Sequence, residues 1–263
     1  QKNQKDMNDP FVATLNYILK TSDEISSDNS PLLEEEFNSF KIRLENESLN
    51  VEMKNNCATE DQARSFVDPY LKAWELDYIL TYGQKEFWFE FNKSTIIDRA
   101  PKCLDGSATA YTNTAHICIT SFSPKVHVTR NQYPLPPKKL KYSPDVESLS
   151  IRYNSFLNGK EPLLSMAYFC YTLITSIKSP KVTSKIYAIH YSVLKKLSEL
   201  TPVRGNKLEA RKFTNTSSFE PLTMPEQNWI IETIKLLIRR KAEYDFDPEG
   251  TFQESTMGEL PAI

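Results

Sequence analysis

Residues 114–129, TAHICITSFSPKVHVT, gather two of the three histidines and one of the four cysteines of the chain. Aliphatic and polar residues alternate on both sides of a loop at residues 121–124, which predicts the two strands of a β-hairpin. A four-residue loop brings the aliphatic side chains to one face. The same pairing sets Cys118 opposite His127, with His116 beside them, so the segment predicts a cluster of these three side chains.

Imidazole and thiolate groups are ligands that suit zinc. As a metal site the cluster would use His116, Cys118 and His127, and one position would remain for water or for Cys103. The alternative is a strand face that carries polar residues and binds no ion, which is the commoner arrangement. We therefore expect no cofactor, and zinc at this hairpin is a lesser hypothesis.

A second candidate is basic. Arg204, Lys207, Arg211 and Lys212 lie in the segment PVRGNKLEARKF, and residues 239–241 add three cations if the fold brings them close. Such groups bind phosphates, and neighbouring aromatic rings can stack on bases. The alternative is a solvated surface with ordinary cations at helix ends. The pattern makes nucleic acid the alternative partner.

The net charge of the chain favours neither nucleic acid nor an anionic membrane as a partner. The 263 residues include 32 lysines and arginines against 34 aspartates and glutamates, a formal net charge of -2 at pH 7. This balance gives no overall attraction to nucleic acid or to an anionic membrane. The longest apolar run, residues 163–177, is shorter than the roughly 20 residues of a membrane-spanning helix, so we expect no membrane partner.

No complete catalytic or cofactor motif occurs, and neither GxGxxG nor GxxxxGK(S/T) is present. Whether the protein is an enzyme is therefore open. The cysteines, Cys57, Cys103, Cys118 and Cys170, are widely spaced without a CxxC pair, in a chain long enough to need no disulfide. The first ten residues are polar and lack the apolar core of a signal peptide. We expect reduced thiols and a cytoplasmic protein.

The N-terminal half mixes helix and strand signals. Pro10 and the apolar residues that follow at helical spacing predict a first helix from Asp9. Alternation over residues 40–53 predicts a hairpin. Thr59 and Gln62 form a capping box for a helix that ends at Gly83.

The phenylalanine-rich segment EFWFEFN, residues 86–92, predicts a strand, and Asn92–Lys93 a turn after it. With the two hairpins this gives about six strands joined by short connections, a pattern typical of an antiparallel sheet. Aromatic residues at this regular spacing are far more often core than ligand-binding.

The C-terminal half is helical. Four prolines in residues 131–145 break both regular periods, so this segment predicts a linker. Capping residues and apolar periodicity then predict helices over residues 143–159, 163–177, 186–200 and 223–241. The acidic residues that follow predict a solvated tail.

The sequence thus predicts an α+β fold, in which an antiparallel sheet unit with covering helices is followed by an all-α helical bundle. The expected divisions are a sheet unit at 1–130, a linker rich in proline and lysine at 131–145, a helical bundle at 146–244 and an acidic tail at 245–263.

This order of halves is similar to that of bacterial abortive-infection proteins that end in a HEPN ribonuclease domain. Those domains use an arginine followed a few residues later by a histidine. No histidine follows Arg204 or Arg211, because His190 is the last in the chain. The similarity is therefore one of element order alone.

The leading functional hypothesis is a soluble intracellular interaction protein that binds another protein, with the helical half as the expected interaction surface. The alternative is a nucleic-acid-binding or nuclease-like protein of a defence type that uses the basic residues of the helical half. The third is a zinc protein built on the hairpin at residues 114–129.

Overall fold

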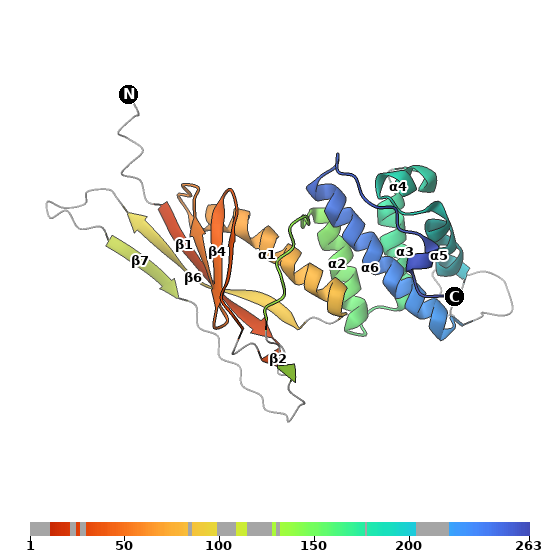
Figure 1. Ribbon diagram of the computed structural model, residues 1–263, viewed down its shortest axis with the longest axis horizontal. Coiled ribbons are helices and arrows are strands. Elements are labelled where there is room, and N and C mark those ends of the chain that lie inside the picture. The colour runs from red at the N-terminus through yellow and green to blue at the C-terminus, as the bar shows by residue number, and fades with distance from the viewer. Residues whose placement is uncertain are drawn as a thin grey trace. The chain divides into compact units, whose positions relative to one another are not determined.

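The computed structural model describes residues 11–21, 25–26, 30–83, 86–98, 109–114, 128–129, 132–176, 178–203 and 221–263 (Figure 1). The chain divides into two compact units. The first, called here the sheet unit, comprises residues 1–79 and 85–136, and the second, the helical unit, comprises residues 80–84 and 137–263. The change from one unit to the other after residue 136 falls within the proline-rich segment.

The sheet unit contains a six-stranded sheet with the strand order β3-β4-β5-β1-β6-β7. Its strands are β1 (Phe11–Thr21), β3 (Leu33–Glu36), β4 (Phe40–Glu45), β5 (Ser48–Met53), β6 (Phe87–Asp98) and β7 (Thr109–Thr114). Each neighbouring pair is antiparallel, which confirms the predicted sheet and the α+β class. β2 (Ile25–Ser26) and β8 (Val128–Thr129) form a separate parallel pair.

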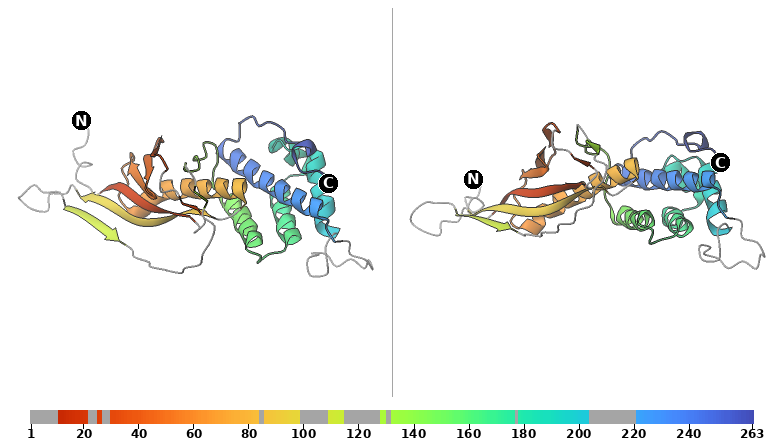
Figure 2. Two further views of the ribbon diagram at one scale, coloured as in Figure 1. Left: turned by 60° about the horizontal axis from the view of Figure 1, so that its bottom comes forward. Right: turned by 90° about the horizontal axis from the view of Figure 1, so that it is seen from below.

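A single long helix, α1 (Glu60–Tyr82), covers one face of this sheet (Figures 1 and 2). Trp74 is fully buried at its centre, and its ring centroid lies 5.5 Å from that of Phe87 and 5.1 Å from that of Phe89. Phe87 and Phe89 of β6 are therefore core residues. Gly83, at a φ of +78°, follows the helix as predicted, in a backbone conformation that favours glycine.

The predicted helix from Asp9 is wrong, because residues Phe11–Thr21 form the strand β1. The segment FVATLNYILKT satisfies two periods, since Leu15, Ile18 and Leu19 suit a helix while Leu15, Tyr17 and Leu19 alternate as in a strand. β1 pairs with β5 on one side and with β6 on the other. Backbone pairing on both edges and burial of the alternating residues decide in favour of the strand.

The predicted turn at Asn92–Lys93 is also wrong, because β6 runs unbroken through these residues. The pairing of β1 with β6 shifts by one residue at two places. Val12 pairs with Ile96 and Thr14 with Thr95, which leaves Ala13 unpaired on β1. Asn16 pairs with Lys93 and Tyr17 with Phe91, which leaves Asn92 unpaired on β6. Each extra residue is a β-bulge.

A buried carboxylate on α1 accepts a backbone hydrogen bond from the first half of β6. β7 pairs only with residues Lys93–Asp98, so the first half of β6 has no strand on that side among the described residues. There the backbone N–H of Phe89 donates to Oε1 of Glu75, 3.0 Å away. Glu75 is only 5% exposed, and its other oxygen accepts from Nζ of Lys72 at 2.7 Å. The helix therefore supplies the acceptor that a further strand would otherwise provide.

Glu75→Ala is expected to lower the free energy of unfolding by about 1–3 kcal/mol, because the N–H of Phe89 is then buried without an acceptor. Urea denaturation measures the loss, and faster amide exchange at Phe89 locates it. Glu75→Gln keeps a carbonyl oxygen and should lose less. Lys72→Ala removes the half-exposed counter-ion but leaves the N–H of Phe89 with its acceptor, so amide exchange at Phe89 should stay slow. Exchange at Phe89 that is as fast in Lys72→Ala as in Glu75→Ala would contradict the assigned role of Glu75.

The helical unit is formed by α2 (Pro144–Leu157), α3 (Leu163–Thr175), α4 (Pro180–Ile186), α5 (Tyr191–Val203) and α6 (Met224–Phe246). α3 packs against all four others, as its apolar sequence requires. Ser143 caps α2, and Thr223 and Glu226 form the predicted capping box of α6. The sequence predicts one helix over residues 186–200. The structure instead has a break between α4 and α5, where Ala188 adopts a φ of +47°.

The C-terminal segment is attached to these helices. The backbone N–H of Ser255 donates to the carbonyl of Ala188, and the N–H of His190 donates to the carbonyl of Ser255, both at 2.8 Å. Arg240 on α6 donates to the carbonyl of Gln253 at 2.7 Å and to Oγ of Ser255 at 3.1 Å. Ser255 is consequently buried.

Candidate functional site

Neither site predicted from the sequence can be located. His116, Cys118 and His127 lie outside the described residues, and the same holds for Arg204, Lys207, Arg211 and Lys212. The described part of the hairpin segment places Val128 in β8, beside Ile25. Within the described ranges, no three His, Cys, Asp or Glu side chains are grouped to hold a metal ion.

The cations at residues 239–241 are engaged within the helical unit. α6 continues past them to Phe246, although the sequence predicts its end at Lys241. Arg240 pairs with Glu243 at 2.8 Å and holds the C-terminal segment. Lys241 is 8% exposed and pairs with Asp245 at 2.7 Å and Asp145 at 3.1 Å. Arg240 and Lys241 therefore stabilise the fold and are not available to a phosphate.

A connected group of polar side chains lies between α1 and the covered face of the sheet. Arg64 pairs with Asp68 at 3.0 Å and lies 3.8 Å from Glu60, and Oη of Tyr17 donates to Asp68 at 2.6 Å. Burial, reinforced by the hydrogen bond to Asp68, raises the pKa of Tyr17 above its ordinary value. Tyr17 thus stays protonated at neutral pH, and its hydrogen bond to Asp68 joins β1 to α1.

The opposite face of the sheet, called here the open face, has no described helix of the sheet unit against it (Figure 2). Strand alternation and the observed register place its residues in rows that cross the sheet. One row contains Glu34, Arg43, Asn50, Asn16 and Lys93, from β3, β4, β5, β1 and β6. The next row contains Glu36, Lys41, Glu52, Thr14 and Thr95.

Three asparagines form the centre of the open face. Nδ2 of Asn16 donates to Oδ1 of Asn50 at 2.8 Å and to Oγ of Ser48 at 3.0 Å. Oδ1 of Asn16 accepts from Nδ2 of Asn92 at 2.7 Å. Asn16 is 9% exposed, whereas Asn50 is exposed. The buried amide therefore fixes the orientation of two outer amides, which retain further donor and acceptor groups.

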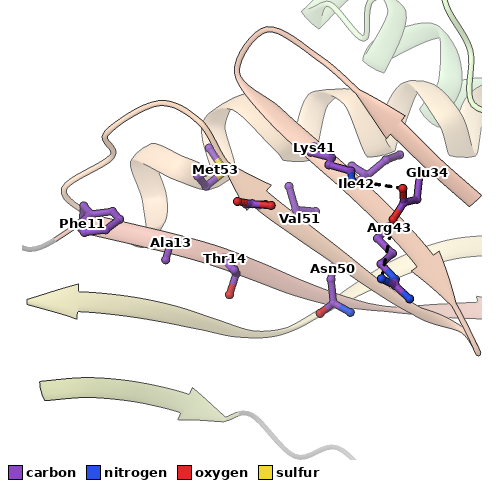
Figure 3. Close-up of a pocket in the computed structure, with 11 residues that line it drawn as sticks. Phe11, Ala13, Thr14, Glu34, Lys41, Ile42, Arg43, Asn50, Val51 and Met53 are labelled. Atoms are coloured by element: carbon purple, nitrogen blue, oxygen red, sulfur yellow. Dashed lines mark ion pairs between the residues drawn. The ribbon is translucent and has the colours of Figure 1, made fainter. Parts of the chain in front are cut away.

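A cavity of about 400 Å³ adjoins this cluster (Figure 3). Its polar lining includes Thr14, Arg43, Asn50 and Glu52. Figure 3 shows the side chains of Thr14 and Asn50, on neighbouring strands, pointing to the same side of the sheet. The volume lies within the range typical of ligand-binding sites, and several polar groups converge on it.

Charges of both signs alternate on the open face. Lys41 lies 3.3 Å from Glu34, and Arg43 lies 2.9 Å from Glu45 and 3.9 Å from Glu34. These pairs are partly exposed and contribute little to stability. Their alternation gives a mixed electrostatic surface, which differs from the continuous positive potential that a nucleic-acid backbone requires.

Searches against protein-family models, curated proteins and solved structures found no match to this chain. No described helix is both long and apolar enough to cross a membrane.

The asparagine cluster was missed in the sequence because Asn16 fell within the segment expected to be helical. The sequence did indicate the position of Asn50. The predicted hairpin at residues 40–53 places Leu49 and Val51 on one face and Asn50 on the other. The contact between Asn16 and Asn50 joins residues 34 positions apart, and no local pattern predicts such a pairing.

Proposed function

We propose that this protein works by binding another protein, and that the binding surface is the open face of the sheet unit instead of the helical half expected from the sequence. The observation that carries the proposal is the asparagine cluster. A nearly buried amide, Asn16, holds Asn50 and Asn92 in fixed orientations at the centre of a sheet face that no described helix of the sheet unit covers. Hydrogen-bonding groups held in this way lose little conformational entropy on binding.

The charges on this face favour a protein over a nucleic acid. Carboxylates interrupt the cations along each row, so a phosphate backbone would meet repulsion as well as attraction. Protein interfaces, in contrast, have polar rims in which charges of both signs alternate with hydrogen-bonding groups. A nucleic-acid-acting protein that uses the basic residues of the helical half remains the second hypothesis.

We further propose a cytoplasmic location and a binding function that needs no cofactor. Cys57 and Cys170 are buried free thiols, which suits a reducing compartment. Burial raises the pKa of the Cys170 thiol to about 12, so this cysteine is unreactive at neutral pH.

Asn50→Arg is expected to reduce partner binding at least tenfold, about 1.4 kcal/mol, because a long charged side chain replaces the exposed amide at the centre of the open face. Affinity capture with quantitative mass spectrometry measures the loss. Asn55→Arg is the matched control, since Asn55 is an exposed asparagine of the same unit outside the cluster.

Proteins retained by the wild type and by Asn55→Arg, but lost from Asn50→Arg, would support the proposal. Equal retention by all three would contradict it. Enrichment of nucleic acid that weakens steeply as salt rises would favour the alternative hypothesis instead.

A further inference from the structure

One carboxylate in the cavity on the open face lacks a counter-ion. The cations that line this cavity, Lys41 and Arg43, are paired with Glu34, and Arg43 also pairs with Glu45. Glu52 lines the same cavity and is exposed, and it forms no ion pair or hydrogen bond with any residue that the structure describes. The cavity therefore has one negative charge available to a ligand.

The neighbours of Glu52 add groups of complementary kinds. Thr14 lies directly opposite Glu52 in the register of β1 with β5, and its hydroxyl can donate or accept. Asn50 lies two residues before Glu52 on β5, so both side chains are on the open face. Because Oδ1 of Asn50 already accepts from Asn16, the amide Nδ2 of Asn50 is left as a donor.

We propose that this cavity receives an arginine side chain of the partner protein, an inference that rests on the proposed function. The guanidinium group is a planar fork that donates two parallel hydrogen bonds to a carboxylate, here Glu52. Nδ2 of Asn50 donates to a backbone carbonyl of the same partner segment. An anionic ligand is disfavoured, because Glu52 repels it and the cations of the cavity are already paired.

The probe for this site is N-acetyl-arginine methylamide, titrated into the full chain and followed by ¹H–¹⁵N NMR. We expect saturable shifts at the backbone amides of Thr14 and Glu52 and at the side-chain amide of Asn50. N-acetyl-citrulline methylamide has nearly the same shape without the charge and should produce no saturable shift. Glu52→Gln should weaken binding of the arginine probe about twofold to fivefold, as expected for loss of an exposed ion pair.

Glu249→Gln is the matched control, because Glu249 is an exposed glutamate of the helical unit without a partner among the described residues. It should leave the shifts unchanged. The inference fails if the arginine probe gives no saturable shift, if citrulline gives the same shifts, or if Glu52→Gln binds the probe as well as the wild type does. If the arginine inference fails in one of these ways, the affinity-capture experiment still tests the proposed function by itself. A partner protein that the wild type retains and Asn50→Arg does not would support protein binding at the open face without an arginine in the cavity.

Discussion

Lys241→Met is expected to lower the free energy of unfolding by about 3 kcal/mol at pH 7, at the lower end of the cost of breaking a buried ion pair. The Lys241 side chain is 10% exposed and that of Asp245 is 14% exposed, whereas Asp145 is 52% exposed. Removing the ammonium group leaves Asp245 negatively charged and nearly buried. The hydrogen bond from Oγ of Ser143 then compensates only part of the desolvation cost of that carboxylate. Urea denaturation measures the loss.

Two further variants separate this cause from a loss of packing. Lys195→Met removes a lysine from an exposed pair with Glu199 and should change stability by less than about 0.5 kcal/mol. Combining Lys241→Met with Asp245→Asn removes the stranded charge and should recover part of the loss. No recovery in the double variant would contradict an electrostatic origin.

The effect of Lys241→Met should depend on pH on the alkaline side. Burial lowers the pKa of Lys241, but the hydrogen bonds to Asp245 and Asp145 and the attraction by Asp245 outweigh burial and raise it above the ordinary lysine value. A raised pKa means that the charged lysine stabilises the fold at neutral pH and up to about 10.5, the ordinary value. The difference in stability between the wild type and Lys241→Met should narrow as the pH rises through the raised pKa.

Trp74→Ala is expected to lower the free energy of unfolding by about 3–5 kcal/mol, the range for truncation of a large buried aromatic residue. Trp74 is fully buried, and it joins α1 to both Phe87 and Phe89 of β6. Its removal leaves a cavity between the helix and the sheet that rigid neighbours cannot fill. Thermal or urea unfolding followed by circular dichroism gives the size of the loss.

The indole nitrogen of Trp74 gives this prediction a finer test. Nε1 is buried without a hydrogen-bond partner in the described structure, so Trp74→Phe removes an unpaired donor along with some volume. It should cost clearly less than Trp74→Ala. Phe66→Ala is the control on the same helix, because Phe66 is 42% exposed and its loss should cost about 0.5 kcal/mol or less. A Trp74→Ala variant as stable as Phe66→Ala would contradict the assigned core.

Local sequence signals predicted the elements that depend on neighbouring residues. The capping box at Thr223 and Glu226, the glycine after α1 and the hairpin at residues 40–53 are all found in the structure. β1 was predicted as a helix because its apolar residues satisfy both periods. Its identity as the strand between β5 and β6 depends on partners distant in sequence. Pairing of this kind outweighs local propensity, and local patterns do not reveal it.

The candidate site was less predictable for the same reason. Alternation alone places Asn50 and Glu52 on one side of their strand. Their meeting with Asn16 and Thr14 requires the register of β1 with β5, and the contact with Asn92 requires an irregularity in β6. The residues that the sequence did single out, His116, Cys118 and His127, lie outside the described ranges, so their clustering stays a prediction.

The two bulges between β1 and β6 compensate each other. Ala13 adds a residue to β1 and Asn92 adds one to β6, so the pairing is shifted only between them and is regular again on either side. Deleting Asn92 would therefore remove one bulge and leave every other residue of β1 and β6 opposite its present partner. Deleting Ala13 would remove the other bulge and keep all three asparagines. Comparing the two deletions offers a way to separate the recognition chemistry of this surface from the scaffold that carries it.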